Sequence, residues 1–188
     1  MVQKQDLISY VAMMAALDAK TVTVHYRYLY EAGHLSKVTG RGRSARNVTI
    51  EDAWSLLLSV AISPSPKIGA EFMPVFSKME TTYLHQTLSA EDLPTIRREI
   101  RGWERLDAVM IPIMKDCGSG ELNRLPGLLS LNTTNFEALL IIDNNRSFFT
   151  CEDEEIPPAA RPFSKWHRKT EIPLPSLLDL AQFVAGEV

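Results

Sequence analysis

Residues 20–46 read KTVTVHYRYLYEAGHLSKVTGRGRSAR, and this stretch decides how we expect the N-terminal third of the chain to fold. Val22, Tyr26 and Leu29 recur at helical spacing, which predicts an amphipathic helix with these side chains on its buried side. Gly33 lies where a helix C-cap glycine belongs, because the left-handed backbone conformation costs glycine least. Glycine and arginine dominate the segment after Leu35, so the sequence predicts a helix that leads into a basic loop.

Further helices are expected on both sides of this segment. Residues 6–17 carry apolar side chains at helical spacing, and two helices separated by a short turn form a candidate helix-turn-helix. After the loop, Thr49 and Asp52 form a capping-box-like pair at the start of another helix. The predicted buried stripe of that helix comprises Ala53, Trp54, Leu57, Leu58 and Ala61. Residues 63–66 contain two prolines, which end the helix and mark a domain boundary.

The middle of the chain is predicted to be helical. Helical periodicity runs over residues 68–88, with Pro74 at a kink or a restart. A second helix is expected to begin at the capping residues Ser89 and Asp92 and to run to about Met114.

The pattern then becomes strand-like. Residues 136–142 and 146–151 are expected to form a hairpin around an Asn-Asn turn, because asparagine tolerates positive φ. Residues 166–172 suggest a third strand, and Pro175 begins a final amphipathic helix.

The sequence therefore predicts a mainly α protein with a small α+β part. The expected order is an N-terminal winged helix-turn-helix, a helical middle, and a C-terminal β-hairpin or meander followed by a helix. The predicted domains are residues 1–64 for the winged helix-turn-helix, 65–120 for a helical connector, and 121–188 for a small α+β association module.

Charge is distributed unevenly along the chain. The whole chain has a formal net charge of −3. Residues 20–46 hold six basic residues against Glu31 alone, which is 6 − 1 = +5, so the remainder carries −3 − 5 = −8. A local basic patch on an acidic body indicates a polyanion bound at one surface only.

The outer face of the helix in residues 20–32 has the side chains that a major-groove helix needs. Arginine can read guanine bidentately, lysine can pair with phosphate, and small β-branched groups can lie against thymine methyl groups. The candidate DNA-binding residues of this helix are Lys20, Thr21, Thr23, Val24 and Arg27.

The basic loop after this helix adds a second set of candidates. Its glycines let the backbone approach a groove closely, and its arginines can bind phosphate or enter a narrow minor groove. The candidate DNA-binding residues of the loop are Lys37, Arg41, Arg43 and Arg46.

In combination these features resemble winged helix-turn-helix regulators, broadly the MarR and MerR-like group, and most closely small proteins of bacterial prophages. The resemblance is carried by Thr21-Val22, by residues 26–29, by the step from Glu31 to Leu35, and by the Gly40-Arg-Gly-Arg43 loop before a leucine-rich helix. It covers about the first third of the chain. It implies that residues 1–64 bind double-stranded DNA and that the protein is a homo-oligomer, with a dimer favoured. The chain departs from MarR in lacking a long N-terminal dimerisation helix, and from MerR in lacking a long C-terminal coiled coil.

Other chemistries lack their residue patterns in this sequence. The 4 histidines form no His-Glu-x-x-His arrangement, and Cys117 and Cys151 alone cannot supply a four-ligand zinc site. No nucleophile, base and acid stand out as a set, so we expect no enzyme, no metal and no cofactor. No apolar run reaches the roughly 20 residues of a membrane span, and no signal segment is evident at the N-terminus. Two cysteines indicate free thiols in a reducing cytoplasm.

The sequence leaves three functions open. The first is a sequence-specific DNA-binding protein that regulates transcription in a phage or other mobile element. The second is a phage DNA-packaging or replication accessory protein that forms a higher oligomer, which the mass in solution would distinguish from a dimer. The third is a protein-interaction module that binds no DNA, which salt-independent binding of a protein partner would favour.

Overall fold

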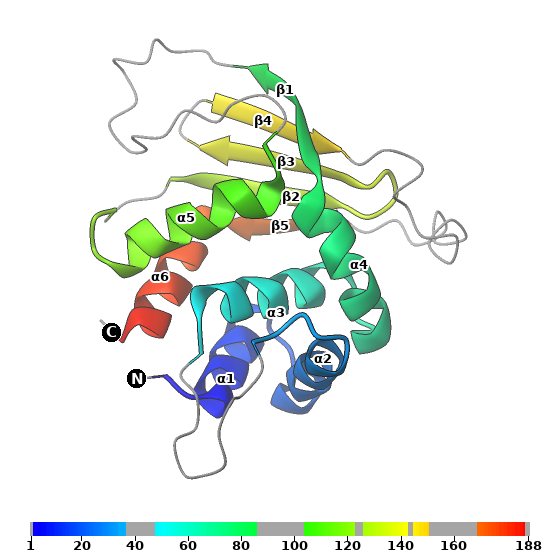
Figure 1. The fold of residues 1–188 in the computed structure, drawn as a ribbon, viewed down its shortest axis with the longest axis vertical. Helices are drawn as coiled ribbons and strands as arrows, with labels where there is room; N and C mark the ends of the chain where they lie inside the picture. Colours follow the sequence, from blue (N-terminus) through cyan, green and yellow to red (C-terminus); the bar gives the residue numbers. More distant parts are fainter. Residues whose placement is uncertain are drawn as a thin grey trace.

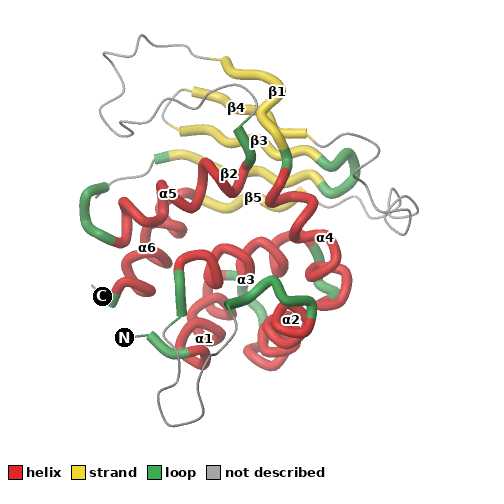
Figure 2. The backbone as a smooth tube through the Cα atoms, in the orientation of Figure 1, coloured by secondary structure: helices red, strands yellow, loops and turns green. Residues whose placement is uncertain are grey.

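Helices gather on one side of the molecule and strands on the other (Figures 1 and 2). The computed structural model describes residues 2–36, 48–85, 104–122, 126–142, 145–150 and 169–186. The helices are α1 (Lys4–Met14), α2 (Ala19–Glu31), α3 (Ile50–Ile62), α4 (Pro66–Lys78), α5 (Leu106–Gly118) and α6 (Leu174–Ala185). The strands are β1 (Glu80–His85), β2 (Gly127–Asn132), β3 (Glu137–Ile142), β4 (Asn145–Thr150) and β5 (Lys169–Pro173).

Helix α3 is the centre of the helical layer. It contacts α1, α2, α4, α5 and α6, and every residue from Asp52 to Ile62 is buried. The sequence predicted a single buried stripe on this helix, and that prediction was too narrow. The sequence of α3 is apolar on nearly all sides, and a helix of this kind is buried by other elements on all sides.

The five strands form one antiparallel sheet in the order β1-β4-β3-β2-β5. Successive side chains of a strand point to opposite faces, and the register places one set of apolar residues on the inner face. The inner set is buried and comprises Leu129, Leu131, Ala138, Leu140, Ile142, Phe149 and Ile172. On the other face Leu139 and Ile141 are half-buried and Phe148 is exposed.

The predicted C-terminal elements are confirmed, although the sheet is larger than expected. Strands β3 and β4 pair as a hairpin, β5 overlaps the third predicted strand and ends one residue beyond it, and α6 is the final helix. Strand β2 was not predicted, and it separates β5 from the hairpin. The fold is therefore mixed α and β rather than mainly α with a small β part.

The helix predicted over residues 68–88 was wrong in its second half. Helix α4 continues through Pro74 but ends at Lys78, and the chain enters β1 instead. Strand β1 pairs with β4, so its backbone hydrogen bonds come from a distant part of the chain. The helix predicted from Ser89 to Met114 is described only in its last part, where α5 begins at Leu106; residues 86–103 lie outside the described ranges.

One continuous set of buried residues joins the helices to the sheet. It includes apolar side chains from all six described helices and from the inner face of the sheet. The Thr170 hydroxyl of β5 also donates a hydrogen bond to the Ala61 carbonyl of α3 at 2.8 Å. The core thus runs across the boundary that we place after residue 64, and the division into three domains stays a prediction. Within the described residues, none of the helices is both long enough and apolar enough to span a bilayer.

Candidate nucleic-acid interface

Helix α2 is fixed in the molecule by one buried face. Val22, His25 and Leu29 are fully buried, while Tyr26 is only half-buried. Val22 and Leu29 were predicted on this face. His25 was not among the side chains predicted on this face, but it lies at the centre of the buried stripe. Its spacing of three residues from Val22 and four from Leu29 is the signal that could have shown this.

A buried polar contact joins α2 to α3. His25 Nδ1 lies 3.0 Å from Ser59 Oγ, within hydrogen-bonding distance. Gly69 of α4 packs against the same pair, since a Cβ atom built there would lie 2.4 Å from the Ser59 carbonyl oxygen and 3.0 Å from His25 Cε1. Three helices therefore meet at this point, and the glycine permits their close approach.

The end of α2 has the geometry that the sequence predicted. Gly33 has a φ of 78°, in the left-handed region. The His34 amide donates to the Leu29 carbonyl at 2.9 Å, and the Gly33 amide donates to the Tyr30 carbonyl at 3.1 Å. These two bonds form a Schellman motif, which turns the chain sharply away from the helix.

The outer face of α2 is solvent-exposed. Lys20, Thr23 and Arg27 are exposed, and Thr21 and Val24 are half-buried. The structure thus brings the five predicted helix residues onto one accessible side of α2 or its margin.

Two of these side chains already have partners within the helix. The Thr23 hydroxyl donates to the Ala19 carbonyl at 2.7 Å. Arg27 Nε lies 3.7 Å from Glu31 Oε1, with both side chains about 60% exposed, and its guanidinium carbon lies 5.4 Å from the centre of the Tyr28 ring. An exposed pair of this kind contributes only about 0.3–0.5 kcal/mol, so a stronger partner could displace it.

The basic loop is anchored at both of its ends. Lys37, Arg41, Arg43 and Arg46 lie outside the described residues. Before the loop, the Ser36 amide donates to Asp52 Oδ1 at 2.8 Å. After the loop, the Thr49 amide donates to Asp52 Oδ2 at 3.2 Å and the Val48 amide donates to the Val2 carbonyl at 3.2 Å. The Asp52 amide donates to Thr49 Oγ1 at 3.2 Å, which confirms the predicted capping box.

Further cationic groups lie beside α2. Lys4 Nζ of α1 lies 4.6 Å from the centre of the Tyr26 ring. Burial lowers the pKa of His34, and the nearby charge of Lys78 lowers it further. Both effects disfavour the charged form of His34, and the Lys78 ammonium is a cation close to this end of α2.

Two other kinds of site chemistry can be compared with the described residues, namely metal binding and thiol reactivity. Within it, no group of three or more His, Cys, Asp and Glu side chains is arranged to hold a metal ion. Burial, with the Asp116 charge, raises the pKa of the Cys117 thiol to about 12, so this thiol carries no thiolate at neutral pH.

Comparison of the chain with protein-family models, with curated proteins and with solved structures found no match. The case for a function therefore rests on the residues themselves.

Proposed function

We propose that this protein binds double-stranded DNA through the outer face of α2 and through the basic loop at residues 37–47. The observation that carries the proposal is the two-sided character of α2. One side packs against the core through Val22, His25 and Leu29. On the opposite side, Lys20 and Arg27 are exposed to solvent. A rigid helix with an accessible cationic face suits insertion into a major groove.

Each residue of this face has a distinct role in the proposal. Lys20, near the start of α2, pairs with a phosphate. Arg27 leaves its ion pair with Glu31 and binds a guanine edge or a phosphate instead. Val24 and the methyl group of Thr23 lie against thymine methyl groups, and Thr21 lies beside them at the edge of the exposed face of α2.

The loop residues Lys37, Arg41, Arg43 and Arg46 supply phosphate or minor-groove contacts in this proposal. Support comes from the anchoring of the loop ends on the first turn of α3, which also packs against α2. This arrangement fixes the two ends of the basic segment on a helix that also contacts α2.

The biological role that we propose is transcriptional regulation in a phage or mobile element, with a symmetric dimer on two half-sites about 34 Å apart. The alternative role is packaging or replication by a higher oligomer, and the mass of the protein in solution decides between them. A mass that corresponds to a ring would contradict the dimer.

Fluorescence anisotropy with a mixed-sequence duplex across a salt series tests DNA binding. Replacing Lys20 and Arg27 together with alanine is expected to reduce the slope of log K against log salt by about 0.9 for each phosphate that is no longer neutralised. Lys67→Ala is the matched control, because Lys67 is also exposed and forms a similar pair with Glu71, with Nζ to Oε1 at 3.9 Å. We expect the control to bind like the parent chain.

Two outcomes would contradict the proposal. If the parent chain binds no duplex even at low salt, DNA binding fails in both of its forms. If the Lys67 control loses as much affinity as the double variant, the protein attracts DNA by overall charge and α2 has no special role.

A further inference from the structure

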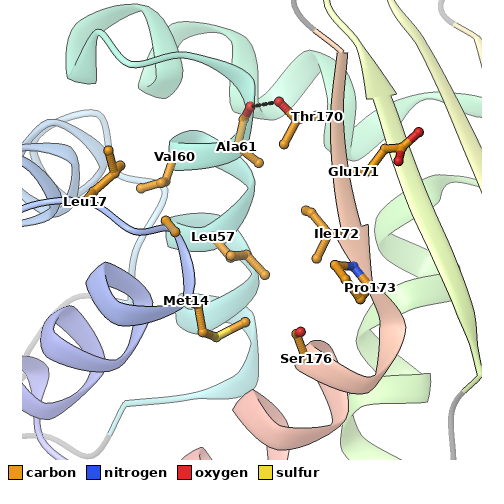
Figure 3. Close-up of a pocket in the computed structure, with 11 residues that line it drawn as sticks. Met14, Leu17, Leu57, Val60, Ala61, Thr170, Glu171, Ile172, Pro173 and Ser176 are labelled. Atoms are coloured by element: carbon orange, nitrogen blue, oxygen red, sulfur yellow. Dashed lines mark hydrogen bonds between the residues drawn. The ribbon is translucent and has the colours of Figure 1, made fainter.

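A pocket of about 200 Å³ lies between the helical layer and the edge strand of the sheet (Figure 3). Its walls come from the end of α1, from α3, from β5 and from the start of α6. The lining residues are Met14, Ala15, Leu17, Leu57, Val60, Ala61, Thr170, Glu171, Ile172, Pro173 and Ser176.

The lining favours a neutral ligand. Among the described residues of the lining, Glu171 is the only charged one, and its carboxylate points away from the space between α3 and β5 (Figure 3). That carboxylate pairs instead with Lys169, with Nζ to Oε1 at 2.7 Å. Because none of the described lining residues directs a compensating charge into the pocket, an ionised ligand would lose hydration there without replacement.

Among the side chains of the described lining, one hydroxyl group is left for a ligand to meet. The Thr170 hydroxyl is engaged by the Ala61 carbonyl at 2.8 Å. The Ser176 hydroxyl faces the space between α3 and β5 (Figure 3), and it makes no hydrogen bond within the described part of the chain. A ligand with one hydroxyl, or a comparable group, would satisfy it.

The size and position of the pocket set the class of ligand. An apolar cavity of about 150 Å³ is sufficient for benzene, so this pocket has room for one aromatic ring with a small substituent. Its rim includes the exposed residues Glu171 and Pro173, which gives the pocket access to solvent.

We propose that this pocket binds a small neutral molecule, about one aromatic ring in size, that carries a single hydrogen-bonding group directed at Ser176. The ring packs against the apolar side chains of α1, α3 and β5, including Leu57, Val60 and Ile172. The hydrogen-bonding group lies at the start of α6.

The site also bears on the helix that we assign to DNA, and this part rests on the proposed function. Met14 is the last residue of α1, and Leu17 lies two residues before α2. Between them Ala16 has a φ of 51°, a conformation that a residue with a side chain rarely adopts. A ligand that contacts both ends of this turn is expected to change how firmly α2 is held.

The binding test uses phenol and toluene as probes of the full chain, by isothermal titration calorimetry. Phenol is expected to bind saturably. Ser176→Ala keeps the space and removes the hydroxyl, so it should weaken phenol binding about fivefold and leave toluene binding unchanged. Ser176→Leu fills the space and should weaken both probes by more than about tenfold.

Three results would overturn the site. They are the absence of saturable binding by either probe, unchanged phenol binding by Ser176→Leu, and an equal effect of Ser176→Ala on both probes. Thermal unfolding of each variant shows whether it is folded, and Ser176→Ala remains decisive if Ser176→Leu is not.

The link to α2 is tested separately with the anisotropy assay. DNA affinity of the parent chain is expected to change more than about twofold at saturating phenol, and that of Ser176→Leu is expected to stay constant. An unchanged affinity of the parent would remove the link to α2 and leave the pocket. Failure to bind DNA without phenol would be a failure of the proposed function, which the calorimetry does not depend on.

Discussion

Replacing Gly69 with alanine tests the packing that holds α2 in place. In the interior of an ordinary helix this change stabilises a protein by about 1 kcal/mol, because alanine is the better helix former. Here the added Cβ atom would lie 2.4 Å from the Ser59 carbonyl oxygen and 2.6 Å from Ser59 Oγ. Helices α3 and α4 must therefore move apart, at a cost of about 1–3 kcal/mol for overpacking. The Cβ atom would also lie 3.0 Å from His25 Cε1, so it disturbs the contact between His25 and Ser59, which contributes about 1 kcal/mol.

The net expectation is that Gly69→Ala lowers the free energy of unfolding by about 1–3 kcal/mol. Urea unfolding measures it, as a lower midpoint with an unchanged slope. Gly118→Ala is the matched control in α5, since its Cβ atom would lie 3.1 Å from the nearest atom, the Ala181 carbonyl oxygen, and its effect should be smaller. A Gly69→Ala variant that is more stable than the parent would refute this reasoning about the junction of the three helices.

The other predictions concern the sheet, one surface ion pair and one thiol. Gly127→Ala is expected to lower stability by about 2–4 kcal/mol in a urea titration, because Gly127 has a φ of 143° and a Cβ atom there would lie 2.0 Å from the Ile141 carbonyl oxygen. Glu51 forms an ion pair with Lys115, with Nζ to Oε1 at 2.6 Å. Burial raises the pKa of Glu51, but its hydrogen bonds and the charge of Lys115 lower the pKa more. The net pKa is therefore below its ordinary value of 4.5. The Glu51 carboxylate therefore stabilises the folded protein above pH 4.5, and this contribution is lost as the pH falls through the lowered pKa. Glu51→Gln should cost about 0.2–1 kcal/mol at pH 7 and less at pH 2, and an equal cost at both pH values would contradict this. Iodoacetamide at pH 8 should leave Cys117 unmodified in the folded protein and modify it in urea, as mass spectrometry of its peptide would show; rapid modification without urea would contradict the burial of this thiol.

The elements that local pattern determines were predictable from the sequence. Val22 and Leu29 recur at helical spacing, Gly33 ends α2, and Thr49 with Asp52 begins α3, so each signal lies within a few residues of the structure that it forms. The hairpin of β3 and β4 is local in the same way, because the two strands are neighbours in the chain. For the same reason the exposed face of α2 could be predicted from residue spacing alone.

Features that depend on distant parts of the chain were missed. Strand β1 is formed by pairing with β4, more than 60 residues later, and nothing within residues 80–85 specifies that partner. Strand β2 lies between β3 and β5 for a similar reason. The role of His25 depends on Ser59 and Gly69, which come from two other helices. The pocket near Ser176 joins four elements, and no local pattern marks it.

The carboxylate of Asp52 joins the two ends of the basic loop. Its two oxygens accept hydrogen bonds from the backbone amides of Ser36, before the loop, and Thr49, after it. One side chain of α3 therefore holds the two anchor residues, Ser36 and Thr49, close to each other. Doubling the length of such a loop costs only about 0.6 kcal/mol in closure entropy. A longer chain between the two anchors is therefore expected to cost little stability as long as Asp52 keeps both of its amide partners.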